Sequence, residues 1–447
     1  MPPSVSPANG HRYSDVLTLV LGSNRKRKLT YIFVATCVLV LFLFAREAYS
    51  YADSLAIPHT RIYTPQEVVS DTRLPEMPSA MPPPPIQPVV FSFIMWSEDS
   101  AAEGAQLIKT ILMYSSGPVD IHVICDDVAE SLLRGRLSLV QRPSHHIRVW
   151  FRKPSWQAML DRIEREGAIK TDHSAGLPGL MKLFIHEILP SNVTKSIFVD
   201  TDALFISDPT LIWDIFSTLK PSTAIVMGSH PDQQAPEWHY ASKICSCVML
   251  LNLEKLRSIR LMDSSIYREM GGVKALSPEA FVAKYGLPGG DGTGRYDNVR
   301  LGDQGYWWAI VDYHPDLFEP LSYDFEVTSC LLQTYHAGLG DELISMEEEQ
   351  KHQIFVKDTP QEGITVLPKL LHFNCLHGTP RYMNWKGWSD PADELTVRWG
   401  PALSYHVGYK WIWLNKGRPN NPDQILEMFT VSNVVFADQL AERSNQL

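Results

Sequence analysis

The chain has few cysteines and no excess of positive charge, and each shortage excludes a class of protein. Only six cysteines occur in 447 residues, with no CxxC pair and no Cys/His finger spacing, which argues against a disulfide framework and a structural zinc module. The formal net charge is -10, and we find no basic stripe in the part expected to fold. Since such a surface repels a polyphosphate backbone, we expect no nucleic-acid partner.

Glycine-rich nucleotide motifs are also missing, and there is no internal repeat. The segment after the first apolar strand, MWSEDSAAEG, lacks the glycine fingerprint of a nicotinamide-dependent dehydrogenase. The stretch GLPGGDGTGRYDN from Gly286 follows no apolar strand and fits neither the dinucleotide nor the Walker pattern. It therefore predicts a loop and not a phosphate cradle.

One long apolar run lies near the N-terminus. Residues 29–45 are uncharged, and residues 25–28 before them are all basic, so the run predicts one membrane span with residues 1–28 in the cytosol. A cleaved signal peptide is the alternative. Residues 46–88 are polar and proline-rich, with consecutive prolines at 82–85, which predicts an extended stem. Residues 89–447 then form a lumenal domain.

That domain begins with alternating strand and helix patterns. Apolar runs of strand length start at Val89, Val119 and His146, and a helical pattern follows the first of them. We therefore expect βαβ units and a mostly parallel sheet. Ligands of such sheets bind at the carboxyl ends of the strands. The candidate nucleoside contacts there are Met95, Trp96, Ser97, Asp126 and Asp127, although the two aspartates could equally cap a turn.

The strongest chemical signal is an acidic pair at the end of an apolar strand. Residues 197–199 run into Asp200 and Asp202, and the alternation of an extended chain would place both carboxylates on one side. Carboxylate oxygens suit Mg²⁺ or Mn²⁺, and the open positions of such an ion can take diphosphate oxygens. An isolated DxD pattern more often marks a solvated turn, but this one ends a buried strand of an α/β domain.

The sequence around this acidic pair, and at several later motifs, resembles glycosyltransferase family 8. The run KLFIHEILPSNVTKSIFVDTDALFISDPTLIW resembles the core of that family, and VMLLNLEKLR, LGDQGYWWAIV and LLHFNCLHGTPRYMNW follow in the family's order. The likeness covers residues 89–388, and the lumenal xylosyltransferases look most similar. It implies an α/β fold of the GT-A-like type, a nucleotide-diphospho-sugar transferase domain with a mostly parallel central sheet, anchored in the Golgi or endoplasmic reticulum membrane as a single-pass type II protein.

The resemblance also implies roles for individual residues. Asp200, Asp202 and His372 would bind the metal, and because an imidazole joins the carboxylates, Mn²⁺ is favoured over Mg²⁺; His377 is a rival to His372. Gly378 and Arg381 would contact the diphosphate, and Lys182 the donor. Asp303 and Gln304 would hold the sugar hydroxyls, so the residues assigned to catalysis are Asp200, Asp202, Asp303 and Gln304.

The implied activity is transfer of a sugar, xylose or another pentose or hexose, from a UDP-sugar to a glycan or glycoprotein acceptor with retention of configuration. The chain departs from the family at Cys245-Ser-Cys247, where relatives have an amide expected to reach the sugar. That departure leaves open a catalytically silent, sugar-binding relative. The sequon at Asn192 is a candidate glycan acceptor on a lumenal surface.

Overall fold

The computed structural model describes residues 87–166, 174–229, 243–262, 299–331, 366–376 and 378–439, with isolated positions between them. The predicted cytosolic tail, the predicted anchor, nearly all of the stem, His377 and most of the glycine-rich stretch lie outside the described residues. Within the described part of the chain, no helix combines the length and the apolar character needed to cross a bilayer.

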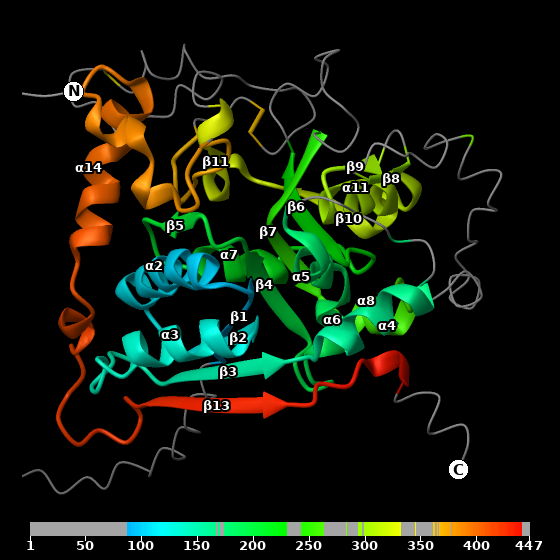
Figure 1. Cartoon of the computed structure of the whole chain (residues 1–447), viewed down its shortest axis with the longest axis horizontal. Coiled ribbons are helices and arrows are strands. Elements are labelled where there is room, and N and C mark those ends of the chain that lie inside the picture. Colours follow the sequence, from blue (N-terminus) through cyan, green and yellow to red (C-terminus); the bar gives the residue numbers. More distant parts are fainter. Residues whose placement is uncertain are drawn as a thin grey trace, which may run out of the picture. The chain divides into compact units, whose positions relative to one another are not determined.

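A mostly parallel sheet of eight strands forms the centre of the described domain (Figure 1). Only β7 runs antiparallel to its neighbours, so the predicted α/β class is confirmed. The strand order is β10-β6-β7-β4-β1-β2-β3-β13. In that order the strands are Phe318–Leu321, Ile225–Ser229, Ile244–Asn252, Lys195–Val199, Val89–Met95, Val119–Cys125, Ile147–Lys153 and Leu426–Ser432.

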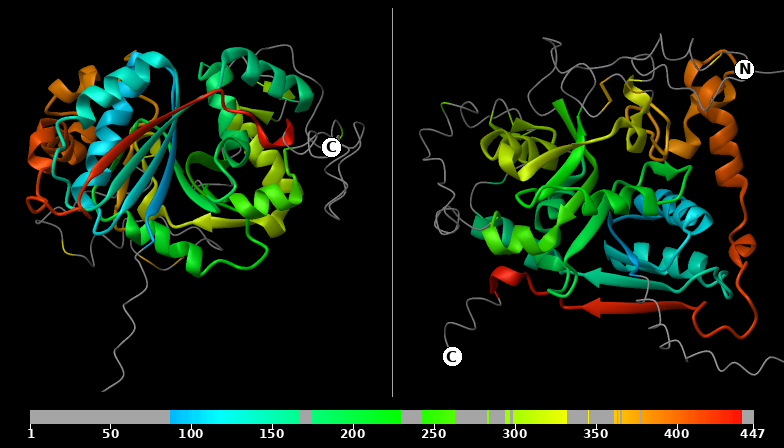
Figure 2. Two further views of the ribbon diagram at one scale, coloured as in Figure 1. Left: turned by 90° about the horizontal axis from the view of Figure 1, so that it is seen from below. Right: turned by 180° about the vertical axis from the view of Figure 1, so that it is seen from behind.

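Helices cover both faces of this sheet (Figure 2). One face packs against α2 (Glu98–Tyr114) and α3 (Asp127–Leu137). The other face packs against α4 (Trp156–Glu166), α5 (Gly176–Leu180), α6 (Ile185–Ile188), α8 (Leu253–Ile259) and α11 (Asp303–Tyr313). Two apolar cores therefore lie back to back across the strands, as expected for a sheet whose strands are apolar on both sides.

Local polar side chains fix where the first two helices begin. Ser97 and Ser100 form a capping box at the start of α2, which satisfies amide groups that have no partner inside the helix. The side chain of Asp126 accepts a hydrogen bond of 2.8 Å from the amide of Ala129. Asp126 is thus a helix cap, one of the two roles that the sequence left open.

A small second sheet lies beside the acidic turn. It consists of β11 (Val327–Thr328), β12 (Leu370–His372) and β5 (Ala203–Phe205). The short helix α7 (Thr210–Trp213) follows β5, and α14 (Glu394–Gly408) packs against this region through Trp399. A two-stranded pair of β8 (Gly294–Tyr296) and β9 (Val299–Arg300) completes the strands.

One disulfide, Cys330–Cys375, joins the segments that follow β11 and β12. Both cysteines are exposed, and the bridge closes a loop of 45 residues. Such a cross-link stabilises a fold mainly by restricting the unfolded chain. The bridge fixes the segment immediately after His372. The sequence could not reveal this pairing, because cysteine pairing depends on the tertiary fold.

Candidate functional site

A cavity of about 900 Å³ opens at the carboxyl ends of β1 and β4. This is the edge of a parallel sheet at which ligands are expected. Eight of the residues predicted from the sequence line it, namely Trp96, Ser97, Lys182, Asp200, Asp202, Asp303, Gln304 and His372. The topology therefore brings together side chains that are up to 276 residues apart, from Trp96 to His372.

Met95 does not line this cavity. Its side chain is fully buried in the core against α2, and a Cβ atom added at Gly104 would come within 2.2 Å of its Cε atom. The reason is the alternation of β1, which directs Met95 toward α2 and its neighbours Ile94 and Trp96 toward the opposite face. The Met95 side chain therefore has a packing role, and a donor contact by this residue stays a prediction.

Strand alternation predicted that Asp200 and Asp202 lie on one side of an extended strand. The structure shows a different arrangement. Strand β4 ends at Val199, and residues 200–202 form a turn that passes the chain to β5 in the second sheet. In this turn the two carboxylates face different partners. Asp200 accepts from the ammonium of Lys182, with an Oδ1–Nζ distance of 2.8 Å, and Asp202 faces His372.

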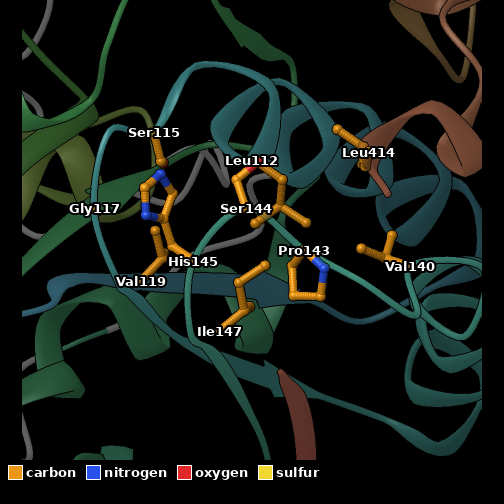
Figure 3. Close-up of a pocket in the computed structure, with 10 residues that line it drawn as sticks. All are labelled: Leu112, Ser115, Gly117, Val119, Val140, Pro143, Ser144, His145, Ile147 and Leu414. Atoms are coloured by element: carbon orange, nitrogen blue, oxygen red, sulfur yellow. The ribbon is translucent and has the colours of Figure 1, made fainter. Parts of the chain in front are cut away.

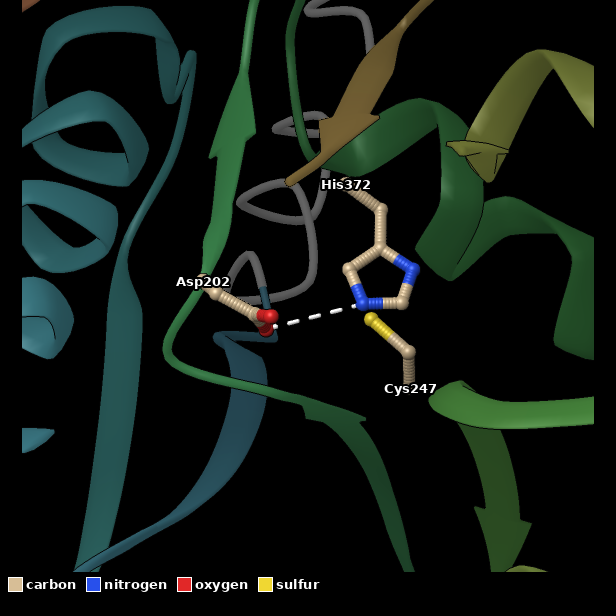
Figure 4. Close-up of side chains that lie close together, drawn as sticks. All are labelled: Asp202, Cys247 and His372. Carbon is tan, nitrogen blue, oxygen red and sulfur yellow. Dashed lines mark ion pairs between the residues drawn. The ribbon is translucent and has the colours of Figure 1, made fainter. Parts of the chain in front are cut away.

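The Asp202 carboxylate and the His372 imidazole point toward each other (Figure 4), with 3.5 Å between Oδ1 and Nε2. Cys247 lies beside the ring, and the ligand atoms of these three residues are all within 4.8 Å of one another. Burial alone would lower the pKa of His372, but the charge and hydrogen bond of Asp202 together with the Cys245 thiol outweigh it and raise that pKa well above the ordinary value. In the same pair, burial disfavours the Asp202 carboxylate, yet His372 lowers its pKa.

Lys182 connects the two acidic parts of the cavity. It lies in the 3-10 turn Met181–Phe184, and its Nζ atom is 3.4 Å from Oδ1 of Asp303 as well as bonded to Asp200. Burial acts against its charge, but the two carboxylates raise the pKa of Lys182 above its usual value. Burial, with the charges of Asp202 and Asp303, raises the pKa of Asp200 to about 7, although Lys182 opposes this.

Asp303 begins α11 and is also held by Ser246, whose hydroxyl donates to Oδ2 at 2.8 Å. Gln304 follows Asp303 and lines the same cavity. Ser246 lies between Cys245 and Cys247 on β7, so the departure from the family pattern is part of the cavity wall. The described site has two thiols where the resemblance implied an amide.

Two acidic residues at or beside the cavity escaped the sequence reasoning. Glu103 on α2 is 9% exposed; it accepts from the amide of Tyr382 at 2.7 Å, and burial followed by the charge of Asp202 raises its pKa to about 7. Its signal was a carboxylate between the buried Ala101 and Ala105. The second is Glu326, 2% exposed beside His372, which no local pattern marks.

The late motif lines a smaller neighbouring cavity of about 220 Å³, which shares Glu103 and Asp202 with the first. Gly378 has a φ of +77°, a conformation that favours glycine. The Arg381 guanidinium pairs with Asp99 in the first turn of α2, and neither Gly378 nor Arg381 lines either cavity. Asn192 is exposed in the turn before β4, where a glycan acceptor needs to be.

Another cavity lies at the opposite end of β2, between Val119, His145 and Leu414 (Figure 3). Its volume of about 10 Å³ holds at most a single water molecule. It is therefore too small for a nucleotide, and the larger cavity is the candidate active site.

Curated relatives of this chain are sugar transferases. It is 28% identical over 257 residues to xylosyl- and glucuronyltransferase LARGE2 of Homo sapiens, covering 55% of this chain and 31% of the relative. It is 32% identical over 119 residues to LARGE2s of Gallus gallus, covering 27% of this chain and 15% of the relative. The matched region is thus less than a third of the length of either relative. No family profile matches the chain.

Two solved structures are among those with a similar fold. Mouse xyloside xylosyltransferase 1 in its apo form has a TM-score of 0.42 and 16% identity, covering 64% of this chain and 98% of that one. The galactosyltransferase LgtC, in complex with donor and acceptor sugar analogues, has a TM-score of 0.44 and 14% identity, covering 74% and 98%. The sequence relatives confirm the predicted resemblance to family 8 glycosyltransferases.

Proposed function

We propose that this chain is a metal-dependent, retaining glycosyltransferase that moves a sugar from a UDP-sugar to a glycan or glycoprotein acceptor in the secretory pathway. One observation carries the proposal. The acidic turn, His372, Lys182 and the start of α11 converge on one cavity at the carboxyl ends of the central strands. The transferase relatives support the same class of reaction.

The donor set at the turn fits a divalent cation. Oδ1 of Asp202 and Nε2 of His372 are 3.5 Å apart, so a small movement of the two side chains would let both bind one ion. A carboxylate together with an imidazole suits Mn²⁺. Asp200 would join them after exchanging its bond with Lys182. When bound, such an ion neutralises charge on the leaving diphosphate.

The remaining residues would bind and orient the donor. Lys182, buried and cationic between Asp200 and Asp303, would place a positive charge beside the cation site. The Asp303 carboxylate would accept hydrogen bonds from sugar hydroxyls. The Gln304 amide could both accept such bonds and donate them. No carboxylate is assigned as a nucleophile, since in the proposed course a leaving phosphate oxygen takes the acceptor proton on the same face of the sugar.

Donor hydrolysis tests this function directly. The purified domain should hydrolyse one member of a panel of UDP-sugars, with UDP-xylose first, and do so only with Mn²⁺ or Mg²⁺ present. Release of UDP measures the turnover. Equal hydrolysis with and without chelator would contradict the metal requirement, and no hydrolysis of any donor would favour the silent sugar-binding alternative that Cys245 and Cys247 leave open.

The affinity for Mn²⁺ should rise with pH across neutrality. In the metal-free chain the pKa of Asp200 is about 7 and that of His372 is raised, so both groups hold protons that the cation must displace. Raising the pH from ~6 to ~8 makes these protons easier to displace and should strengthen binding by up to about tenfold per unit for each proton displaced. Titration calorimetry in buffers of different ionisation enthalpy measures the Mn²⁺ affinity and the number of protons released. An affinity that does not change with pH would contradict the assignment of Asp200 and His372 as ligands.

We also propose the lumenal location of the domain, with residues 29–45 as its anchor. The Cys330–Cys375 disulfide supports this, because exposed disulfides persist in oxidising compartments. A protease-protection assay on sealed microsomes tests it: the described domain should be degraded only after detergent is added.

A further inference from the structure

Behind the cavity floor lies a second group of potential metal ligands, Cys245, Glu326 and His372. All three are buried, and their ligand atoms lie within 4.8 Å of one another. Nδ1 of His372 is 3.7 Å from Oε1 of Glu326 and 4.0 Å from Sγ of Cys245. This is the ring nitrogen that faces away from Asp202, so the group shares His372 with the predicted cation site but uses the other nitrogen of its ring.

Glu326 is the unusual member of this group. The residue is 2% exposed, its polar neighbours are the His372 ring and the Cys245 thiol, and no nitrogen or oxygen donor lies within hydrogen-bond distance of either carboxylate oxygen. A buried carboxyl group without such partners costs folding free energy and calls for an explanation. A cation that is bound by the carboxylate oxygens of Glu326 would provide that explanation.

The glycine at position 228 leaves space for the Glu326 carboxylate. Gly228 on β6 lies opposite Cys245 on β7, where the register shifts after Met227. A Cβ atom added at Gly228 would come within 1.9 Å of Oε2 of Glu326. The absence of a side chain at that bulge therefore admits the carboxylate beside the Cys245 thiol.

We propose that Cys245, Glu326 and His372 bind a thiophilic divalent cation, with Zn²⁺ as the most suitable. A thiolate, an imidazole and a carboxylate are the donors that Zn²⁺ prefers. Around tetrahedral Zn²⁺, with bonds of about 2.0 Å to N or O and about 2.3 Å to S, donor atoms lie ~3.3–3.5 Å apart. The observed 3.7 and 4.0 Å need to shorten by only a few tenths of an ångström.

Charge balance favours the same ion. On binding, the protons held by the Cys245 thiol, the His372 ring and the Glu326 carboxyl group pass to solvent, so that a thiolate, a carboxylate and a neutral imidazole together carry two negative charges. These cancel the charge of a divalent cation in a buried place, where an uncompensated charge would be costly. Cys245 and His372 also line the cavity, which gives the ion a path to the site and leaves room for water as the fourth ligand.

Occupation of this site would remove His372 from the site at Asp202. A neutral imidazole that ligates through Nδ1 carries its proton on Nε2, the atom 3.5 Å from Asp202. Nε2 then donates to that carboxylate and cannot bind a second cation. This exclusion rests on the proposed function, whereas the Zn²⁺ site itself does not.

Cobalt substitution tests the site without any assay of activity. The purified chain, reduced only at its free thiols, should bind one Co²⁺ with a thiolate-to-cobalt charge-transfer band, and Zn²⁺ should abolish that band. Cys245→Ser should lose the band and weaken Zn²⁺ binding at least about a hundredfold, and Glu326→Gln should weaken it at least about tenfold. Circular dichroism of the metal-free variants checks that they fold.

Cys247→Ser is the matched control, since Cys247 is also buried on β7 but its thiol groups with Asp202. It should keep the band. Absence of the band from the wild-type chain, or its loss in Cys247→Ser and not in Cys245→Ser, would overturn the proposal.

Donor hydrolysis then tests the exclusion separately. Zn²⁺ at a concentration that fills the site should inhibit Mn²⁺-dependent turnover in the wild-type chain at least tenfold more strongly than in Cys245→Ser. A normal cobalt band without any donor hydrolysis would contradict the proposed function and leave the Zn²⁺ site supported. Equal inhibition of the two proteins would overturn the exclusion alone.

Discussion

Asp202→Asn should lower metal-dependent sugar transfer by about a thousandfold. The substitution keeps the size of the side chain but removes the negative charge that faces Nε2 of His372. A cation that stabilises the leaving diphosphate is worth several kcal/mol in the transition state, and loss of about 4 kcal/mol corresponds to ~10³ in rate. Initial rates of UDP release at saturating Mn²⁺ measure the effect.

Asp316→Asn is the matched control for that variant. Asp316 is exposed in the 3-10 turn before β10 and does not line the cavity, so its variant should retain wild-type turnover. Asp202 faces the buried His372 ring, so unfolding transitions of both variants are measured to show that Asp202→Asn remains folded. If Asp202→Asn turns over as fast as Asp316→Asn, the acidic turn is not the cation site.

Arg162→Ala should lower the free energy of unfolding by about 3–5 kcal/mol, the usual cost of breaking a buried ion pair by removal of one partner. The Arg162 guanidinium is 1% exposed and binds both carboxylate oxygens of Glu187 at 2.7 Å. It also donates to the carbonyl oxygen of Met262 at 2.9 Å. Its removal leaves the Glu187 carboxylate buried without this partner. Urea denaturation followed by circular dichroism gives the free-energy difference.

The exposed pair of Arg398 and Glu394 on α14 provides the comparison. Its atoms are 3.2 Å apart at an i,i+4 spacing, and such surface pairs contribute about 0.3–0.5 kcal/mol. Arg398→Ala should therefore change the midpoint of unfolding very little. A similar loss of stability in both variants would show that burial does not set the strength of the Arg162 pair.

The sequence predicted the sheet well because its strands are buried on both faces. Continuous apolar runs starting at Val89, Val119 and His146 became β1, β2 and β3 with ends shifted by only a few residues. One helix start also has a local signal, since Asp126, whose role the sequence left open, caps the helix that begins one residue later. Periodicity and capping depend on neighbours in the chain, so one sequence is enough to recognise them.

Features that depend on distant residues could not be predicted. Alternation failed at Asp200 and Asp202 because the chain must turn there to reach β5, whereas Met95 within β1 follows it. Glu326 reaches His372 only through the pairing of β11 with β12. The Cys330–Cys375 bridge likewise follows from that pairing and from no spacing pattern.

The last strand has a consequence for biosynthesis. β13 pairs in parallel with β3 along all seven of its residues, although nearly the whole folded domain separates the two strands in the chain. While a ribosome is still making the intervening segments, the outer side of β3 exposes unpaired amide and carbonyl groups that can recruit another chain. We expect nascent molecules to need chaperone protection until β13 emerges.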